Sequence, residues 1–303
     1  MHKRILVIYY TQTGQTLKII QSLIKPFEGA DELTLVFEAI RPVPEFPFPW
    51  NSKAFFQAMP ESVQGLGCAI APMEIQPGEN FDLVILAWQA WFLSPSLPIQ
   101  GWLQSASGQA LLKGKPVITI TGCRNMWVMA LQDIKQSLAV VGAKHLGNIA
   151  LRDKAPNLLS VFSIARWLFY NQKEKSGLIP RAGVSEQDIA RCREFGESIK
   201  AALLQDDLTQ LQPALIRQGA VEVLPGLVAL EKGGKKMFGL WSKFVRRKGN
   251  QGDPARNFRL KLFEIYLYVV LFILSPISFV VFKMLFWVAP HRFKRIVEQY
   301  QAI

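Results

Sequence analysis

The sequence has few of the residues that build disulfide frameworks or metal sites. Its 303 residues include three cysteines and three histidines, all widely spaced, and no C-x-x-C pair occurs. Scarce, unpaired cysteines are typical of a reducing compartment and argue against a disulfide scaffold or a structural zinc site. The histidines are also too scattered to form a metal cluster, so we expect no bound metal.

The sequence also lacks the glycine patterns of common nucleotide-binding motifs. Neither the phosphate-binding pattern G-x-x-x-x-G-K-[ST] nor the spaced glycines of the dinucleotide fingerprint occurs. A triphosphate site usually needs the lysine of the first pattern together with magnesium. We therefore do not expect the chain to bind a nucleoside triphosphate.

Acidic residues are outnumbered, and the excess of positive charge is concentrated in one segment. The chain has 35 Lys and Arg against 23 Asp and Glu, a net charge of +12. Between Lys232 and Lys261 there are ten Lys or Arg and a single acid, Asp253. A basic run of this kind can bind nucleic acid or anionic lipid.

The residues that follow the basic segment favour lipid. Ile265 to Phe282 is a run of 18 residues without a charge, the lower limit for crossing about 30 Å of hydrocarbon. Pro276 would kink a helix there. We expect this part to hold the protein at the cytoplasmic face of a membrane, with basic side chains on anionic headgroups. A single crossing, a kinked half-inserted hairpin and a buried core helix remain alternatives, and nucleic-acid binding is not expected.

Strand and helix patterns alternate along the first two hundred residues or so. Strands are predicted at residues 4–10, 32–40, 81–88, 115–122 and 144–151, and helices at 16–27, 125–141 and 184–204. This alternation predicts an α/β fold with a parallel sheet covered on both faces. The proline-rich residues 41–62 are predicted to form a stiff loop and a short helix.

The first predicted strand runs into an uncharged polar turn at the start of a helix. Thr11, Thr13 and Thr16 offer hydroxyls there, and Gly14 lets successive backbone N–H groups converge. The positive end of the helix dipole favours an anion, so the turn suits a phosphate monoester held by neutral donors. An ordinary strand–helix turn with a threonine cap is the alternative.

The spacing T-x-T-G-x-T in this turn resembles the phosphate loop of the flavodoxin family, which binds FMN. The resemblance implies a doubly wound five-stranded parallel sheet in the order 2-1-3-4-5. It also implies that one loop holds the FMN phosphate, and this loop comprises Thr11, Gln12, Thr13, Gly14, Gln15 and Thr16. Two further loops of the family hold the flavin ring.

In this sequence the first ring-binding loop supplies Trp88, Gln89, Ala90, Trp91 and Phe92. The second supplies Thr121, Gly122, Cys123, Arg124 and Asn125. Aromatic faces in the first loop suit stacking on a flavin, although we expect either Trp88 or Trp91 to be a core residue. Cys123 is expected to be a small packing residue.

Further segments are similar to one group of flavodoxin-like proteins, those of dialkylresorcinol and aryl polyene pathways, often labelled dialkylresorcinol condensing enzymes. The matching residues are 46–50, 55–62, 121–127 and 229–244. This resemblance implies an FMN-dependent, membrane-associated oxidoreductase that aromatises a cyclohexanedione bearing alkyl or polyene chains. It also implies a pathway ketosynthase as a partner.

Arg124 is the residue expected to tune the flavin. A cation near the flavin stabilises its reduced anion and raises its potential, whereas the alternative is a surface arginine without a role. No base is identified, because the candidates Tyr10, Glu45, Glu61 and His145 are not placed by any spacing.

These patterns divide the chain into three predicted parts. Residues 1–205 form the FMN-binding domain, 206–257 a helical basic linker, and 258–303 an apolar membrane-anchoring segment with a basic tail. Two other functions remain open. One is an NAD(P)H-dependent quinone reductase, and the other is a membrane scaffold that has lost its cofactor.

Overall fold

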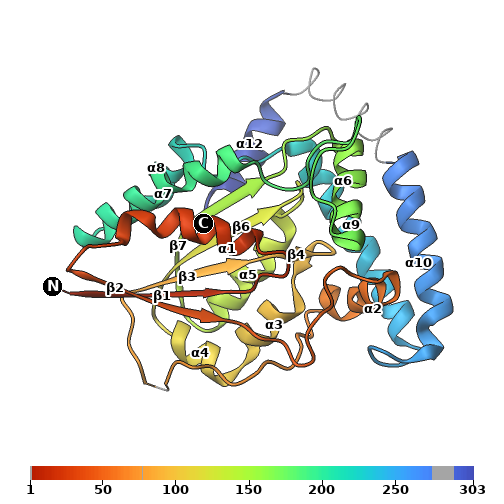
Figure 1. Cartoon of the computed structure of the whole chain (residues 1–303), viewed down its shortest axis with the longest axis horizontal. Coiled ribbons are helices and arrows are strands. Elements are labelled where there is room, and N and C mark those ends of the chain that lie inside the picture. Colours follow the sequence, from red (N-terminus) through yellow and green to blue (C-terminus); the bar gives the residue numbers. More distant parts are fainter. Residues whose placement is uncertain (1, 77, 275–289) are drawn as a thin grey trace.

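A five-stranded parallel sheet forms the centre of the protein (Figure 1). The computed structural model describes residues 2–76, 78–274 and 290–303. The strands are β1 (Lys3–Tyr9), β2 (Leu33–Ala39), β3 (Leu83–Trp88), β6 (Pro116–Cys123) and β7 (Lys144–Arg152). Their spatial order is β2-β1-β3-β6-β7, which confirms the predicted order 2-1-3-4-5. This is the flavodoxin-like doubly wound arrangement, in which the order reverses between β1 and β3.

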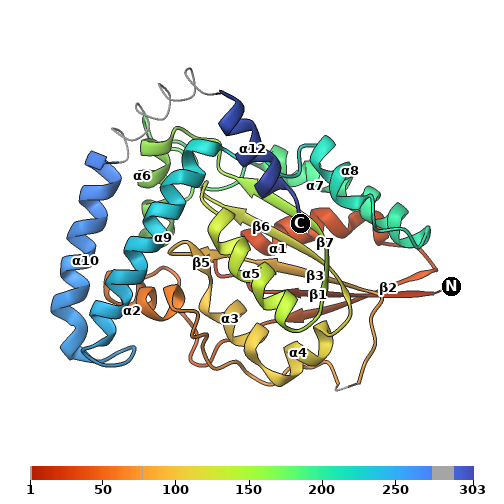
Figure 2. The ribbon, with the colours of Figure 1, turned by 180° about the vertical axis from the view of Figure 1, so that it is seen from behind.

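The central strands are buried because helices cover both faces of the sheet. Every side chain of β3 is buried, as are Ile5 to Ile8 of β1, and such strands read as continuous apolar runs. Figures 1 and 2 show α1 (Gln15–Ile24) and α7 (Glu186–Leu204) on one face. The opposite face carries α3 (Leu97–Gln104), α4 (Ala106–Leu112) and α5 (Val128–Val140).

Helix boundaries follow local capping chemistry. The predicted helix at 16–27 ends as a 3-10 turn, Lys25–Phe27. Ser185 caps α7 by accepting a hydrogen bond from the Asp188 N–H at 3.0 Å. After the proline-rich loop, α2 (Ser52–Val63) begins where the Asn51 side chain accepts from the Ala54 N–H at 2.7 Å. The predicted loop and short helix at residues 41–62 are therefore confirmed.

Two elements near the predicted loops were not anticipated. They are the small hairpin of β4 (Ala90–Trp91) and β5 (Ser94–Pro95), and helix α6 (Asn157–Tyr170). The α6 sequence NLLSVFSIARWLFY is apolar around most of its circumference. Its buried residues are Ser160, Ser163 and Trp167, so the helix lacks the buried apolar stripe of 3.6-residue period that usually marks a helix in a sequence.

The chain after residue 205 folds back onto the sheet domain. It forms α8 (Leu211–Arg217), α9 (Pro225–Arg246), a 3-10 turn (Pro254–Arg256), α10 (Asn257–Val269), a π-helical turn (Val270–Leu274) and α12 (Pro290–Gln301). Leu211, Leu215 and Val228 belong to the main core, and so does Tyr300 of α12. The division into three parts at residues 205 and 257 stays a prediction.

The predicted membrane segment lies only partly within the described residues. Residues 265–274 belong to α10 and the π-helical turn, while the rest of the apolar run Ile265 to Phe282 lies outside the described part. Among the helices that the structure describes, none combines the length and the apolar character needed to cross a bilayer.

Candidate functional site

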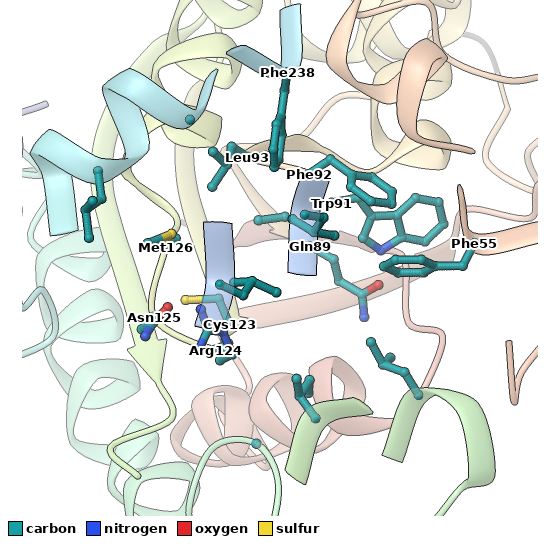
Figure 3. Close-up of a pocket in the computed structure, with 18 of the residues that line it drawn as sticks. Phe55, Gln89, Trp91, Phe92, Leu93, Cys123, Arg124, Asn125, Met126 and Phe238 are labelled. Carbon is teal, nitrogen blue, oxygen red and sulfur yellow. The ribbon is translucent and has the colours of Figure 1, made fainter. Parts of the chain in front are cut away.

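A cavity of about 530 Å³ lies where the strand order reverses, at the carboxyl ends of β1, β3 and β6 (Figure 3). Ligands of doubly wound sheets bind at this position. The wall is mostly apolar, and it comes from the three loops after these strands together with α6, α9 and α10. Its size is that of a pocket for a cofactor or another small molecule.

The three predicted loops meet at this cavity. The predicted residues that line it are Gln12, Thr13, Gln15, Thr16, Gln89, Ala90, Trp91, Phe92, Gly122, Cys123, Arg124 and Asn125. The predicted residues that do not line it are Thr11, Gly14, Trp88 and Thr121. Residues far apart in the sequence thus share one wall, because parallel strands end at the same edge of the sheet.

Trp88 and Thr121 are core residues rather than cavity residues. The Trp88 side chain is fully buried in the main core, so the expectation that one of the two tryptophans is a core residue is confirmed. The Thr121 Oγ1 donates to the Trp88 carbonyl oxygen at 2.9 Å. This bond joins β6 to β3, and the predicted contact of these two side chains with a cofactor is corrected.

The turn after β1 forms an open helix N-terminus. Gly14 precedes α1 with φ 78°, a left-handed conformation that glycine adopts without strain. No side chain caps the helix, its first turn has no acidic residue, and the bond from the Gln15 N–H to Thr13 Oγ1 is long at 3.5 Å. The buried Thr11 Oγ1 has no hydrogen-bond partner among the described residues. The open N–H groups fit an anion such as a phosphate monoester, whereas the Thr11 hydroxyl lies outside the cavity wall.

Gln12 ties this turn to the proline-rich loop. Its Oε1 accepts from the Trp50 indole Nε1 at 2.9 Å, and its Nε2 donates to the Pro47 carbonyl oxygen at 3.1 Å. Both hydrogen bonds are made within the protein. The Gln12 side chain therefore positions the aromatic loop beside the turn.

Two other polar side chains of the turn also have protein partners. The Gln15 Oε1 accepts from the Val184 N–H at 2.9 Å, which joins α1 to the segment before α7. The Thr16 Oγ1 accepts from Gln89 Nε2 at 3.0 Å, which joins the first loop to the second. These bonds fix the relative positions of the loops that line the cavity.

Aromatic side chains build one wall of the cavity. Trp91 makes edge-on contacts with Tyr10, Phe46 and Trp50, with ring centroids 5.9, 5.0 and 5.4 Å away. Figure 3 shows Trp91 beside Phe55 and Phe92 on the same side of the cavity. Edge-on packing of this kind holds the indole in one orientation, so the proline-rich loop stabilises a rigid aromatic surface.

The loop after β6 passes very close to α1. A Cβ on Gly122 would lie 2.5 Å from the Ile19 Cδ1, so a larger residue would force the loop away. The Asn125 Nδ2 donates to the Asn157 Oδ1 at 2.7 Å, while the buried Asn125 Oδ1 has no partner in the described part of the chain. A cavity-lining acceptor without a partner suits an N–H of a ligand.

Arg124 anchors the beginning of α6. Its Nη1 donates to the Asn157 carbonyl oxygen at 3.1 Å, and to the Asn157 Oδ1 and the Ser160 Oγ at 3.0 Å each. Burial lowers the pKa of the guanidinium, but an arginine in a protein stays charged. The site therefore has a positive charge in its wall.

The four candidate bases do not line the cavity. Burial raises the pKa of the Tyr10 hydroxyl, and Glu45 is exposed on the proline-rich loop. The Glu61 carboxylate forms a bidentate ion pair with Arg256, with both N–O distances at 2.9 Å. His145 lies on β7, where burial lowers its pKa to about 4.

Cys123 does line the cavity, but its thiol is not activated. Its Sγ lies 3.6 Å from the Leu151 carbonyl oxygen. Burial raises the pKa of this thiol far above its usual range, so the nucleophilic thiolate does not form near neutral pH.

The far half of the cavity was missed by sequence reasoning. It is formed by Ile164, Trp167, Leu168, Ala229, Leu230, Gly233, Gly234, Met237, Phe238, Tyr266, Leu267, Val270 and Leu271. The pair Gly233-Gly234 inside α9 is the signal that could have indicated it, because glycine weakens a helix interior. A Cβ on Gly233 would meet no atom within 4 Å, and one on Gly234 would lie 2.9 Å from the Leu93 Cδ1.

No metal centre is found in the part of the chain that the structure describes, because no three His, Cys, Asp or Glu residues lie close enough to share an ion.

A scan against protein-family models and a search of curated proteins both found no match. Among solved structures, similarity is found to a flavoprotein in complex with FMN from Lactobacillus acidophilus. The identity is 15% over 49% of this chain and 93% of that chain, with a TM-score of 0.39.

Similarity is also found to two further solved structures. Flavodoxin 1 from Bacillus cereus is 12% identical over 67% of this chain and 97% of its own, with a TM-score of 0.33. The flavoenzyme NAD(P)H:(acceptor) oxidoreductase FerB from Paracoccus denitrificans is 13% identical over 67% and 98%, with a TM-score of 0.32. These likenesses are weak, so the fold assignment rests on the strand order of the sheet itself.

Proposed function

We propose that the protein is an FMN-dependent oxidoreductase. The observation that carries this proposal is one cavity at the point of strand-order reversal that joins an uncapped helix N-terminus, a rigid aromatic wall and a loop with an orphaned amide oxygen. These three features suit a phosphate, a flat ring system and the polar edge of that ring, respectively.

The residues present fit FMN without any cationic side chain at the phosphate. Thr13 and the N–H groups that follow Gly14 would hold the phosphate, Trp91 would lie against the ring, and Asn125 would accept a ring N–H. Bound FMN supplies a hydride acceptor or donor. The positive charge of Arg124 in the wall favours the reduced, anionic cofactor, so it makes the site a better oxidant.

We further propose that the substrate is a cyclohexanedione with apolar chains, which is oxidised to an aromatic diol. Oxidation would remove a hydride and a proton from the ring, bound FMN would supply the hydride acceptor, and enolisation would complete the aromatic system. The apolar far half of the cavity supports this substrate class. Among the described lining residues there is no carboxylate and no histidine, which suits a 1,3-dione because such a dione is acidic enough to lose its proton without a strong base.

We also propose that the protein acts at the cytoplasmic face of a membrane. Transfer of each methylene group from water into lipid is favourable by about 0.8 kcal/mol, so a substrate with alkyl or polyene chains resides in the membrane. An enzyme of the ketosynthase class would produce such a dione and is the partner that we propose.

The deciding experiment is a visible absorption spectrum of the purified full-length protein, followed by reconstitution with FMN. We expect a flavin spectrum that is lost when Thr13→Ala and Gly14→Ala are introduced together. A colourless protein that does not take up FMN would overturn the proposal and favour the scaffold function. Reduction of a quinone driven by NADPH, without oxidation of the dione, would favour a quinone reductase.

A further inference from the structure

The outward side of α10 is apolar where a helix on a water-facing surface normally carries charge. The exposed large side chains on this side are Phe258, Ile265, Tyr268, Val269, Phe272 and Ile273, the last two in the π-helical turn. Their exposed fractions run from 38% to 73%. The spacing places them along one stripe of the helix surface, which the exposed Lys261 interrupts between Phe258 and Ile265.

The inward side of the same stretch is apolar as well. Tyr266, Leu267, Val270 and Leu271 line the cavity. A helical stretch that is apolar on both sides is expected to be buried or in contact with lipid, and contiguous exposed apolar patches mark interaction sites. The stretch at 265–273 therefore separates the cavity from an apolar surface on the outside.

Helix α6 extends this surface next to α10. Leu158 and Phe162 are exposed, while Ile164, Trp167 and Leu168 line the cavity. The Phe162 and Phe272 rings are in contact, with their centroids 5.3 Å apart. We call the exposed side chains of the two helices the outer apolar face, which comprises Leu158, Phe162, Phe258, Ile265, Tyr268, Val269, Phe272 and Ile273.

The charges around the outer apolar face are positive. Within α6 and α10 the single acid is Glu264, and it pairs with Lys261 at 3.0 Å. On the adjoining helix α9, Lys236 and Lys243 are exposed, whereas Lys235, Arg246 and Lys232 contact Asp133, Glu61 and the Tyr300 ring on other helices. A second copy of the chain would bring like charges together across a symmetric interface, whereas anionic lipid headgroups would complement them.

We infer that the outer apolar face binds a lipid bilayer that contains anionic headgroups. This inference rests on the membrane association proposed above and assigns it to a surface. Because the other side of α6 and α10 is the cavity wall, only these two helices separate the hydrocarbon of the bilayer from the cavity. An apolar substrate dissolved in the bilayer is then delivered beside its site.

The test measures co-flotation of the full-length protein with vesicles of phosphatidylcholine mixed with phosphatidylglycerol. Binding should weaken without phosphatidylglycerol and at high salt. Phe162→Asp should lower the partition coefficient into vesicles by about tenfold or more, because a charge replaces a ring that the bilayer would otherwise bury. Leu158→Asp, on the same face, should act in the same direction, which guards against a folding defect specific to position 162.

The matched control is Val140→Asp on α5, where the valine is 80% exposed and lies outside the outer apolar face. It should leave vesicle binding unchanged, and all variants should keep the wild-type thermal unfolding temperature. Phe162 is far in sequence from the apolar run that starts at Ile265, so its effect reports on the surface.

The outcomes separate the two proposals. A wild-type protein that binds neither vesicle would overturn membrane association as a whole. Normal vesicle binding by both α6 variants would overturn only the assignment to the outer apolar face. FMN binding is measured in a separate titration, so a failure to bind flavin does not change the conclusion about membrane association or about the outer apolar face.

Discussion

The carboxylate of Glu231 on α9 accepts a hydrogen bond from the Met129 N–H in the first turn of α5, at 2.8 Å. A carboxylate at a helix N-terminus is favourable because it faces the positive end of the dipole. This contact connects the basic helix α9 to α5, which follows the loop that carries Arg124 and Asn125. The side chain is only 1% exposed, so it is desolvated as well as bonded.

Glu231 should make stability depend on pH. Burial raises its pKa from 4.5 to about 7, although backbone N–H groups and Lys235 oppose this effect. The folded state then keeps a proton that the unfolded chain releases, so the free energy of unfolding falls as pH increases through this window. Glu231→Gln should remove this dependence, which amounts to at most about 3 kcal/mol. Urea denaturation of the wild type and of Glu231→Gln at pH 5 and pH 8 measures this dependence. A difference in unfolding free energy between the two proteins that is the same at both pH values would contradict the raised pKa.

The buried ion pair of Glu61 and Arg256 should be costly to break. Arg256 is fully buried and contacts both carboxylate oxygens of Glu61. Arg256→Ala leaves the buried Glu61 carboxylate with only the longer contact to the Arg246 Nε at 3.5 Å, and it should lower the free energy of unfolding by about 3 kcal/mol. Arg193→Ala, in the exposed pair with Glu197, should change it by about 0.5 kcal/mol or less. Similar losses of unfolding free energy in the two variants would contradict a larger contribution from the buried pair.

Gly14 should contribute to FMN binding as well as to stability. Gly14 and Gly29 both have a positive φ, 78° and 72°, and a Cβ at either would meet no atom within 4 Å. Alanine at either position should therefore cost a similar strain, about 1 to 2 kcal/mol. Only Gly14→Ala should also weaken FMN binding, by about tenfold, because it shifts the converging N–H groups. Equal FMN affinities in isothermal titrations of the two variants would remove the turn from the site.

Trp91 should contribute to FMN affinity through its ring. Trp91→Ala should weaken FMN binding by about threefold to tenfold, which corresponds to the free energy of one aromatic contact. Trp241 is a matched control, since it contacts Phe244, Phe263 and Tyr266 but does not line the cavity. Trp241→Ala should lower thermal stability and leave the FMN dissociation constant of the folded protein unchanged. A loss of affinity in both variants would point to general destabilisation.

The absence of a side chain at Gly233 should leave cavity volume for the apolar chain of the substrate. Gly233 and Gly239 both lie within α9, and a Cβ at either would meet no atom within 4 Å, but only Gly233 lines the cavity. Leucine at either position should stabilise the helix by about 0.5 to 1 kcal/mol. Only Gly233→Leu should weaken binding of an alkylresorcinol, measured by equilibrium dialysis. Unchanged binding in this variant would place the apolar chain elsewhere.

Local sequence patterns determined much of the sheet and of the phosphate turn. Strands buried on both faces are continuous apolar runs, so all five could be located to within a few residues. The turn at Gly14 was equally readable, because glycine adopts a left-handed conformation without strain and short hydroxyl residues favour turns. The two further cavity-lining loops were identified through the resemblance to the flavodoxin family.

Tertiary packing decided the rest. Which of Trp88 and Trp91 faces the cavity depends on the sheet register and on the aromatic contacts of Trp91, which come from the proline-rich loop. Glu61, a candidate base by residue type, lies beside Arg256 because α2 packs near the 3-10 turn before α10. The far half of the cavity and the outer apolar face arise only when α6 meets α10 through Phe162 and Phe272. Sequence periodicity describes one element at a time, whereas these features depend on contacts between elements distant in the chain.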